Sequence, residues 1–380
     1  MKLLVICEPR FCGNKKATVN LAMNEILYSY QEFFDEVHCL VPADVNASNV
    51  YGKNGIVFHT VDTYKGGKIK KFLHQFKKPV ISINEIVEKH KITHIQIRVP
   101  STFSISFYNS IMKIKKDLVV TTYVAGDVYD NLVLNFKKVP FIKFIAKYLE
   151  RQQNILIRET TVVTTGDVLK EKYKYLNKNI HAFYSTTHND IILGNNNYEE
   201  PILSIVFVGR VDVAKRLDIL IKTVNELTKN GIEVKVNIIG DGPQLKFIKA
   251  MVNEFGIEKQ FSFYGYVNDR KLIDKILLNS SIFVLTSITE GTAKVPPEAM
   301  SRGVVPIAVK NVGSNNYIIQ HNVNGFLVKK NDYKQIAEIL SKLNKDRQLI
   351  KRLQKEAYTY AKFKTAKNEI TKMWEFILSK

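Results

Sequence analysis

The stretch TSITEGTAKVPPEAM, residues 286–300, decides how this chain is interpreted. A short apolar run precedes it and is typical of a buried strand. Pro296 and Pro297 can open a helix, because a proline in the first helical turn lacks only an N–H that would have no partner there. Two carboxylates, Glu290 and Glu298, flank this strand–loop–helix corner. Helix N-termini attract anions, and carboxylates accept hydrogen bonds from hydroxyl groups. The corner therefore predicts a ligand with phosphate and sugar hydroxyls, such as a nucleotide-sugar.

The size and charge of the chain limit the classes of function. Its 380 residues predict two domains, and a hydrophobic content of 45% is enough for two cores. The chain has 56 basic and 36 acidic residues, a net charge of +20. This excess favours a polyanionic partner, which could be an anionic membrane surface, a phosphorylated substrate or nucleic acid. A general richness in Lys, Asn and Ile is an equally good explanation of the charge.

The cysteine and histidine patterns predict neither a disulfide framework nor a metal site. Cys7, Cys12 and Cys39 are odd in number and form no C-x-x-C motif, which indicates a reducing compartment. The eight histidines have no metal-ligand spacing along the sequence, and we expect no metal requirement. Residues 1–7 are typical of a first buried strand, not a signal peptide. No apolar run reaches the length of about 18 residues that a membrane-spanning helix needs.

Short apolar runs alternate with helical patterns along the whole chain, which predicts parallel sheets covered by helices on both faces. The predicted strands are Lys2–Cys7, Glu36–Val41, Ile56–Thr60, His94–Ile97, Leu118–Tyr123, Thr161–Thr164, Leu203–Val208, Lys235–Ile239, Phe261–Tyr264, Ser281–Leu285, Val304–Val309 and Phe326–Val328. An Asn-rich stretch from Leu193 to Pro201 divides the halves. We therefore expect an α/β fold of two doubly wound, Rossmann-like domains facing a cleft, with ligands at the carboxyl ends of the strands.

Other residues at predicted strand ends could contact the same ligand. Gly209 allows a tight exit from its strand, after which Arg210 and Lys215 can bind phosphate oxygens. Gly240-Asp241-Gly242-Pro243 reads mainly as a structural turn. The backbone around Tyr266 and Val267 can offer hydrogen bonds to the edge of a nucleobase.

The C-terminal half resembles the retaining glycosyltransferases of family 4, which have the GT-B fold. The matching motifs are Gly209-Arg210, Lys215, Gly240-Asp241-Gly242, Phe263-x-Gly265, Ser287-x-x-Glu290-Gly291, Glu298-Ala299-Met300, Gly303-x-x-Pro306 and Asn324-Gly325-Phe326. The resemblance implies that Arg210 and Lys215 bind the donor diphosphate, that Glu298 binds the ribose, and that Glu290 lies at the donor sugar.

The loop after Glu290 departs from this family. Gly291-Thr292-Ala293-Lys294 replaces the usual Gly-Phe-Gly or Gly-x-Pro. We expect Gly291, Thr292 and Ala293 to contact the donor, with Lys294 either adding a cation beside the phosphates or facing solvent.

The N-terminal half matches the same family less closely. Gly13 is the single match to the family's glycine-bearing loop near the donor phosphates. The segment Thr121–Tyr129 resembles the family's T-x-H-G-x-D-V stretch, but Val124 stands at the histidine position and Ala125 at the glycine position. Asp127 fits, and we predict that it positions the acceptor, with helix capping as the competing interpretation.

The expected domains are residues 1–193 for the acceptor, a linker at 194–201, residues 202–360 for the donor, and a C-terminal helix over 361–380. The resemblance implies that this helix crosses back to the first domain, with Ile370, Trp374 and Ile377 on its apolar face. The basic segments Tyr64–Lys78 and Leu134–Leu149 can lie on an anionic membrane. For the second segment, a core helix with solvated lysines is the alternative.

The patterns and the resemblance together predict a glycosyltransferase that is cytoplasmic and associated with the inner face of the cell membrane, and the resemblance implies that it retains configuration. The expected donor is a nucleotide-sugar, with a UDP-sugar as first candidate, and the expected acceptor is a lipid-linked or cell-surface glycan. Glu290, Asp127 and Lys215 are the candidate catalytic residues. The alternative is a catalytically inactive, nucleotide-sugar-binding accessory subunit. A nucleic-acid binder lacks any recognisable motif, and a glycoside hydrolase would not place a phosphate-binding corner between its two acids.

Overall fold

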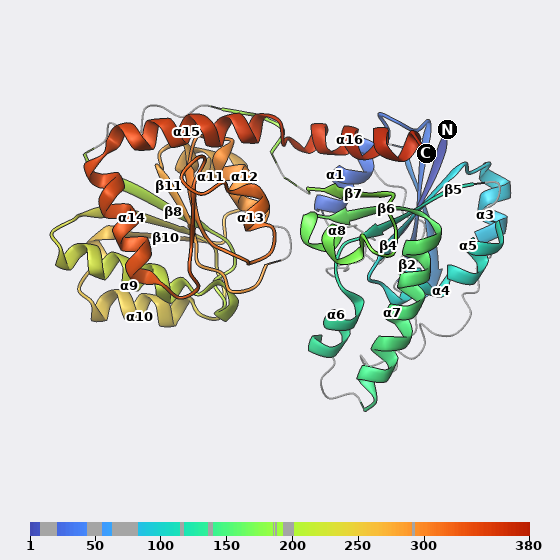
Figure 1. The fold of residues 1–380 in the computed structure, drawn as a ribbon, viewed down its shortest axis with the longest axis horizontal. Helices are drawn as coiled ribbons and strands as arrows, with labels where there is room; N and C mark the ends of the chain where they lie inside the picture. Colours follow the sequence, from blue (N-terminus) through green and yellow to red (C-terminus); the bar gives the residue numbers. More distant parts are fainter. Residues whose placement is uncertain are drawn as a thin grey trace. The chain divides into compact units, whose positions relative to one another are not determined.

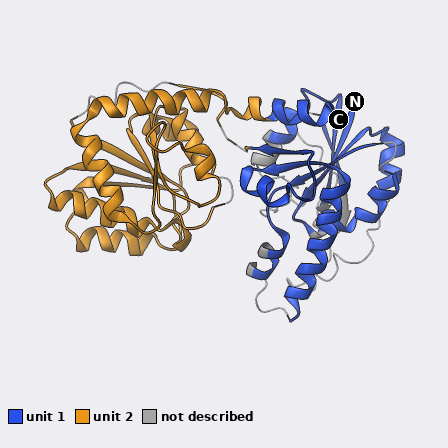
Figure 2. Ribbon diagram, viewed as in Figure 1, with its two compact units in different colours: residues 1–183, 370–380 blue, residues 184–369 orange. Residues whose placement is uncertain are grey.

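The computed structural model describes residues 1–7, 21–43, 55–62, 83–114, 118–135, 140–184, 186, 188–192, 201–290 and 293–380. The chain divides into two compact units (Figure 2). Unit 1 contains residues 1–183 and 370–380, and unit 2 contains residues 184–369.

Unit 1 is built on a parallel sheet of seven strands in the order β3-β2-β1-β4-β5-β6-β7 (Figure 1). Its strands are β1 (Lys2–Ile6), β2 (Glu36–Ala43), β3 (Ile56–Asp62), β4 (His94–Val99), β5 (Val119–Val124), β6 (Thr161–Thr165) and β7 (Ile180–Phe183). Its helices are α1 (Leu21–Tyr30), α3 (Ile83–His90), α4 (Thr102–Ser106), α5 (Tyr108–Ile114), α6 (Val128–Asn135), α7 (Ile142–Glu159), α8 (Asp167–Tyr173) and most of α16 (Ala366–Leu378).

The inner strand β1 is buried on both faces. Leu4 and Ile6 belong to one hydrophobic cluster, whereas Leu3 and Val5 belong to another. Successive side chains of a strand point to opposite faces, so the two clusters lie on the two faces of the sheet. This arrangement explains why the first strand reads as a continuous apolar run.

Unit 2 contains a six-stranded parallel sheet in the order β10-β9-β8-β11-β12-β13. Its strands are β8 (Leu203–Val208), β9 (Val234–Ile239), β10 (Phe261–Gly265), β11 (Ile282–Leu285), β12 (Val305–Val309) and β13 (Phe326–Val328). Its helices are η2 (Val213–Lys215), α9 (Leu217–Lys229), α10 (Leu245–Glu254), η3 (Glu258–Gln260), α11 (Arg270–Leu278), α12 (Val295–Met300), α13 (Asn315–Ile318), α14 (Tyr333–Lys345) and α15 (Arg347–Lys362).

The sheets confirm the predicted fold class. All twelve predicted strands are present within a few residues of their expected bounds. The sequence missed β7, a four-residue edge strand in which only Ile180 and Phe183 are buried, because so short a run has no clear period. Of the predicted linker, residues 194–200 lie outside the described residues.

Helix α16 contributes an apolar face to the core of unit 1. Ile370, Met373, Trp374 and Ile377 are all buried there. The indole of Trp374 packs against the rings of Tyr30 and Phe34, with centroid distances of 4.9 and 4.7 Å. The last residues of the chain therefore complete a unit that begins at residue 1.

Within the described ranges, we find no helix with the length and hydrophobicity that crossing a bilayer requires.

Trp374→Ala should lower the free energy of unfolding of unit 1 by about 3–5 kcal/mol, because it leaves a large cavity among buried aromatic rings. Urea denaturation followed by circular dichroism measures this change. Tyr175→Ala, which removes an exposed ring in the same unit, should change the free energy by no more than about 0.5 kcal/mol. Equal effects of the two substitutions would contradict the proposed role of Trp374.

Candidate functional site

The ends of β8 and β9 approach each other so closely that they require glycine. A Cβ atom on Gly240 would lie 1.8 Å from the carbonyl oxygen of Gly209, and Gly240 has a φ of +142°. The backbone N–H of Gly209 donates to Ile239, at 2.9 Å, and that of Gly240 donates to Gly265, at 2.8 Å. The carboxyl ends of β8, β9 and β10 are thereby held together at one edge of the sheet.

Lys215 is held in place by its backbone. It ends the short helix η2, where Oδ1 of Asp212 accepts hydrogen bonds from the N–H groups of Ala214 and Lys215, at 3.0 and 3.2 Å. The hydroxyl of Thr286 donates to the carbonyl of Lys215, at 2.8 Å. The N–H of Ile288 donates to the carbonyl of Ala214, at 2.9 Å. The loop after β11 is therefore attached to the loop after β8.

This attachment brings Lys215 and Glu290 together, as the sequence predicted for a shared site. Nζ of Lys215 lies 2.5 Å from Oε1 of Glu290, and both side chains are largely buried. Arg210 lies on the same β8 loop with its side chain 72% exposed, and its Nε is 3.8 Å from a carboxylate oxygen of Asp212. A partly buried cation, a carboxylate and an exposed guanidinium thus gather at the ends of β8 and β11.

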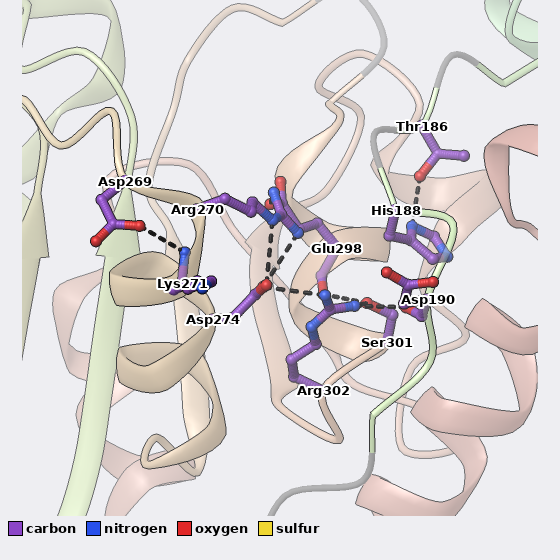
Figure 3. Close-up of polar contacts among 10 residues, drawn as sticks. All are labelled: Thr186, His188, Asp190, Asp269, Arg270, Lys271, Asp274, Glu298, Ser301 and Arg302. Atoms are coloured by element: carbon purple, nitrogen blue, oxygen red, sulfur yellow. Dashed lines mark hydrogen bonds and ion pairs between the residues drawn. The ribbon is translucent and has the colours of Figure 1, made fainter.

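Glu298 lies in the first turn of α12, which begins with Val295 and contains both predicted prolines. Glu298 is only 7% exposed. Its carboxylate forms an ion pair with Arg270 of α11 (Figure 3). A carboxylate buried to this extent is costly without a partner. Arg270 therefore compensates a charge that would otherwise destabilise unit 2.

Arg270 is part of a longer chain of charges (Figure 3). Its guanidinium also pairs with Asp274, at 3.2 Å, and Asp274 pairs with the buried Arg302, at 3.0 Å. Arg302 donates in turn to the carbonyl of Asp190, at 2.6 Å. Burial lowers the pKa of Arg270, but the nearby Glu298 and Asp274 outweigh that effect and raise it.

The sequence analysis did not select Arg270, Asp274 or Arg302. Arg270 and Asp274 stand four residues apart on α11, and Glu298 on α12 stands four residues before Arg302, which lies just beyond that helix. Such spacing is common on solvated helix faces, so it carries no specific signal. Only the packing of α11 beside α12 distinguishes these residues from ordinary surface charges.

The remaining predicted donor contacts are partly outside the described residues. Gly291, Thr292 and Gly13 lie in segments that the structure does not describe. Ala293 is buried. Tyr266 is exposed and Val267 half-buried, and both follow the carboxyl end of β10.

In unit 1, Asp127 precedes α6 and follows the carboxyl end of β5. Its carboxylate pairs with Lys172 and accepts a hydrogen bond from the hydroxyl of Tyr173, at 3.3 Å. Burial and the nearby Asp127 raise the pKa of Tyr173. Val124, at the position where the family has histidine, is fully buried at the end of β5. Of these two positions, only Asp127 carries a polar side chain, and that carboxylate is already paired with Lys172.

Comparisons with known proteins show similarity in the C-terminal part of the chain. Residues 189–360 match the family model described as glycosyl transferases group 1. Protein CapJ of Staphylococcus aureus is 24% identical over 333 residues, which cover 84% of this chain and 80% of that protein. An Escherichia coli UDP-Gal:alpha-D-GlcNAc-diphosphoundecaprenol alpha-1,3-galactosyltransferase is 32% identical over 30% of this chain and 28% of that protein.

Solved structures share the whole fold. HepE of Anabaena in complex with UDP has a TM-score of 0.71 and 15% identity, with all of both chains covered. The apo form of WaaB, a lipopolysaccharide outer core galactosyltransferase, has a TM-score of 0.73 and 14% identity over 100% of this chain and 99% of that chain. These similarities confirm the predicted GT-B architecture.

Gly240→Ala should lower the free energy of unfolding of unit 2 by about 3–5 kcal/mol, because backbone strain adds to the overlap with Gly209. Gly231→Ala is the matched control, since Gly231 also has a positive φ, of +71°, but a Cβ there would have no neighbour within 4 Å. It should lose only about 1–2 kcal/mol. Thermal and urea unfolding measure both, and an equal loss would contradict the close approach.

Proposed function

We propose that this chain transfers a sugar from a nucleotide-sugar to a lipid-linked or cell-surface glycan with retention of configuration. The match of residues 189–360 to the family model described as glycosyl transferases group 1 supports this proposal. The first candidate donor is a UDP-sugar. The relative that uses UDP-Gal and the structure of HepE with UDP-glucose support this choice.

The pairing of Lys215 with Glu290, on the loop that also carries Arg210, is the observation that supports this proposal. A diphosphate needs concentrated positive charge, and arginine and lysine provide it by different means, a planar fork and a point charge. Before the donor binds, Glu290 compensates the charge of Lys215 at 2.5 Å. When a diphosphate takes over that role, Glu290 becomes available to a hydroxyl of the donor sugar.

Glu298 is the candidate partner of the ribose. A carboxylate can accept hydrogen bonds from two neighbouring hydroxyl groups, and the pairing with Arg270 holds the Glu298 side chain in position. Tyr266 and Val267, at the neighbouring end of β10, are candidates to contact the nucleobase.

In the proposed reaction, the bond between the anomeric carbon and the diphosphate oxygen breaks. The acceptor oxygen forms its bond to that carbon on the same face. The acceptor proton passes to an oxygen of the leaving diphosphate. Lys215 and Arg210 stabilise the charge that develops on the diphosphate, which is the largest contribution that such a site can make. These two cations are the reason why we expect no metal requirement for the transfer itself.

Acceptor binding falls to unit 1 in this proposal. Asp127 is the candidate for positioning the acceptor hydroxyl, because alignment of the reacting oxygen lowers the barrier without any covalent step. The buried Val124 supports the alternative function, an inactive accessory subunit that binds the donor, because it cannot replace a histidine in proton transfer or hydrogen bonding.

Helix α7 offers a surface for an anionic membrane. Phe141, Phe144 and Tyr148 are 82, 76 and 54% exposed, and Lys143 and Lys147 are exposed beside them. The N-terminal end of α7 projects beyond the sheet of unit 1 (Figure 1). Exposed aromatic rings with interleaved lysines suit the interface of an anionic bilayer. We propose that this end of α7 holds the enzyme at the inner face of the cell membrane, near a lipid-linked acceptor. The other predicted basic segment, Tyr64–Lys78, lies outside the described residues.

Lys215→Met should weaken the binding of UDP by at least about tenfold, because it removes a charged hydrogen bond that contributes about 1.5–3 kcal/mol. Isothermal titration calorimetry with UDP measures this change in affinity. The double variant Lys215→Met/Glu290→Gln should bind UDP equally weakly. Because it also removes the charge of Glu290, its free energy of unfolding shows whether the weak binding comes from the lost contact or from misfolding. Lys259→Met, which changes an exposed lysine elsewhere in unit 2, should bind as the wild type does.

A panel of UDP-, GDP- and ADP-sugars with membrane extract as acceptor distinguishes the two functions. Turnover of one donor that is lost in Glu290→Gln would support the transferase. Tight binding without turnover would support the accessory subunit. Binding that is unchanged in Lys215→Met would contradict the proposed diphosphate site.

The double variant Lys143→Glu/Lys147→Glu should bind vesicles containing phosphatidylglycerol about 30-fold more weakly, since each lysine near an anionic surface contributes about 1 kcal/mol. Vesicle flotation measures this change. Lys235→Glu/Lys259→Glu alters the net charge equally at exposed positions of unit 2 and should have little effect. Equal weakening by both pairs would show that net charge alone, not α7, drives membrane binding.

A further inference from the structure

Three histidines that are far apart in the sequence meet on one face of the sheet of unit 1. His38 lies on β2, His59 on β3, and His90 is the last residue of α3. Their rings are mutual neighbours, with centroid distances of 5.2 Å between His38 and His59, 4.7 Å between His38 and His90, and 5.0 Å between His59 and His90. The sequence shows no metal-ligand spacing for these residues, because only the fold brings them together.

The ring nitrogens are spaced as a small metal ion requires. One nitrogen from each ring lies within 4.8 Å of the other two, and Nδ1 of His38 is 2.9 Å from Nε2 of His59. Zinc binds imidazole nitrogen at about 2.0–2.1 Å with tetrahedral geometry, which separates its ligand atoms by roughly 3.4 Å. The 2.9 Å separation is shorter than this value, and the limit of 4.8 Å leaves room for it.

A carboxylate orients the most buried of the three rings. Nε2 of His38 lies 3.2 Å from Oε2 of Glu36, whose other oxygen accepts a hydrogen bond from Nζ of Lys2, at 2.6 Å. An Nε2–H that donates to Glu36 leaves the lone pair on Nδ1, which faces His59. Metal-binding histidines are commonly fixed by such a carboxylate at the remote nitrogen. The pair of Glu36 and His38 therefore selects the tautomer that can bind a metal.

The charge around the cluster also suits a cation. His90 is at the C-terminal end of α3, where the helix dipole favours positive charge. Lys2 and Lys89 oppose a cation. Lys2, however, is already paired with Glu36.

From this arrangement we propose that His38, His59 and His90 form a site for a divalent transition metal, best suited to Zn²⁺, with water in the fourth position. Neutral imidazoles select zinc and its neighbours over Mg²⁺ and Ca²⁺, which prefer oxygen ligands. The bound ion joins β2, β3 and α3, so its role is to stabilise this part of unit 1. It is separate from the proposed donor site, which lies in unit 2.

Titration of the chelator-treated full-length protein with Co²⁺ tests the site, since tetrahedral Co²⁺ has intense visible absorption bands. We expect one ion per chain, displacement by Zn²⁺, and a rise in the melting temperature with Zn²⁺ that EDTA reverses. His59→Gln and His90→Gln should each reduce the affinity for Co²⁺ by more than about 100-fold. Glu36→Gln should reduce it by about 10–100-fold, as is usual when the partner of a metal-binding histidine is lost.

His321→Gln is the matched control, because it removes an exposed histidine from unit 2, and it should bind Co²⁺ as the wild type does. Circular dichroism shows whether each variant is folded. If the histidine variants do not fold, X-ray absorption spectroscopy of the Zn²⁺-bound wild type identifies the ligands of the metal. We expect three imidazole ligands. Absence of Co²⁺ binding by the wild type, a spectrum without imidazole ligands, or unchanged affinity in folded His59→Gln and His90→Gln would overturn the proposal. None of these outcomes depends on donor binding or transfer.

Discussion

The close approach of the loops after β8 and β9 is the constraint on which the site of unit 2 depends. Because the sheet is parallel, every strand delivers its carboxyl end to the same edge, and the loops there compete for space. Gly240 has no side chain, so its backbone can lie against Gly209. The β8 loop then turns into η2, and the hydrogen bonds of Thr286 and Ile288 to that segment bring Glu290 to Lys215. Any side chain in place of Gly240 would overlap the backbone of Gly209 and displace the β8 loop.

The charges of unit 2 are arranged at some cost to stability. Glu298 and Arg302 are almost fully buried, and buried ion pairs rarely repay the loss of hydration. Their partners Arg270 and Asp274 connect them in one chain, so that no charge in it is left uncompensated. An apolar pair would pack as well without such a cost. Retention of charged side chains at this place agrees with the role we propose for Glu298, which is to bind hydroxyl groups of a donor.

Unit 1 is also built on a parallel sheet, but it carries an exposed aromatic stripe and a cluster of histidines. One of its hydrophobic clusters includes the apolar face of α16, so residues from both ends of the sequence share one core. The stripe of Phe141, Phe144 and Tyr148 is left exposed, although Ile142 and Ala146 of the same helix are buried. One helix thus presents an apolar face to the core and aromatic rings to the surroundings. The histidine cluster lies between β2, β3 and α3, among elements that carry none of the proposed donor contacts.

The sequence by itself determined the fold class, because strands buried on both faces must be apolar throughout and helices between them force parallel order. It also determined that Arg210, Lys215, Glu290 and Glu298 belong to one edge, since each follows a predicted strand or opens a helix beside it. The short edge strand β7 escaped detection, because it buries only two side chains.

Only the tertiary structure decided the partners of these groups. The pairing of Glu298 with Arg270, and the meeting of His38, His59 and His90, depend on packing between elements that are distant along the chain. Local sequence patterns report which face of an element is apolar, but contacts between polar side chains follow from the register and packing of whole elements. That is why the sequence could locate the strand ends and their charged residues, but could not show which charges and rings touch.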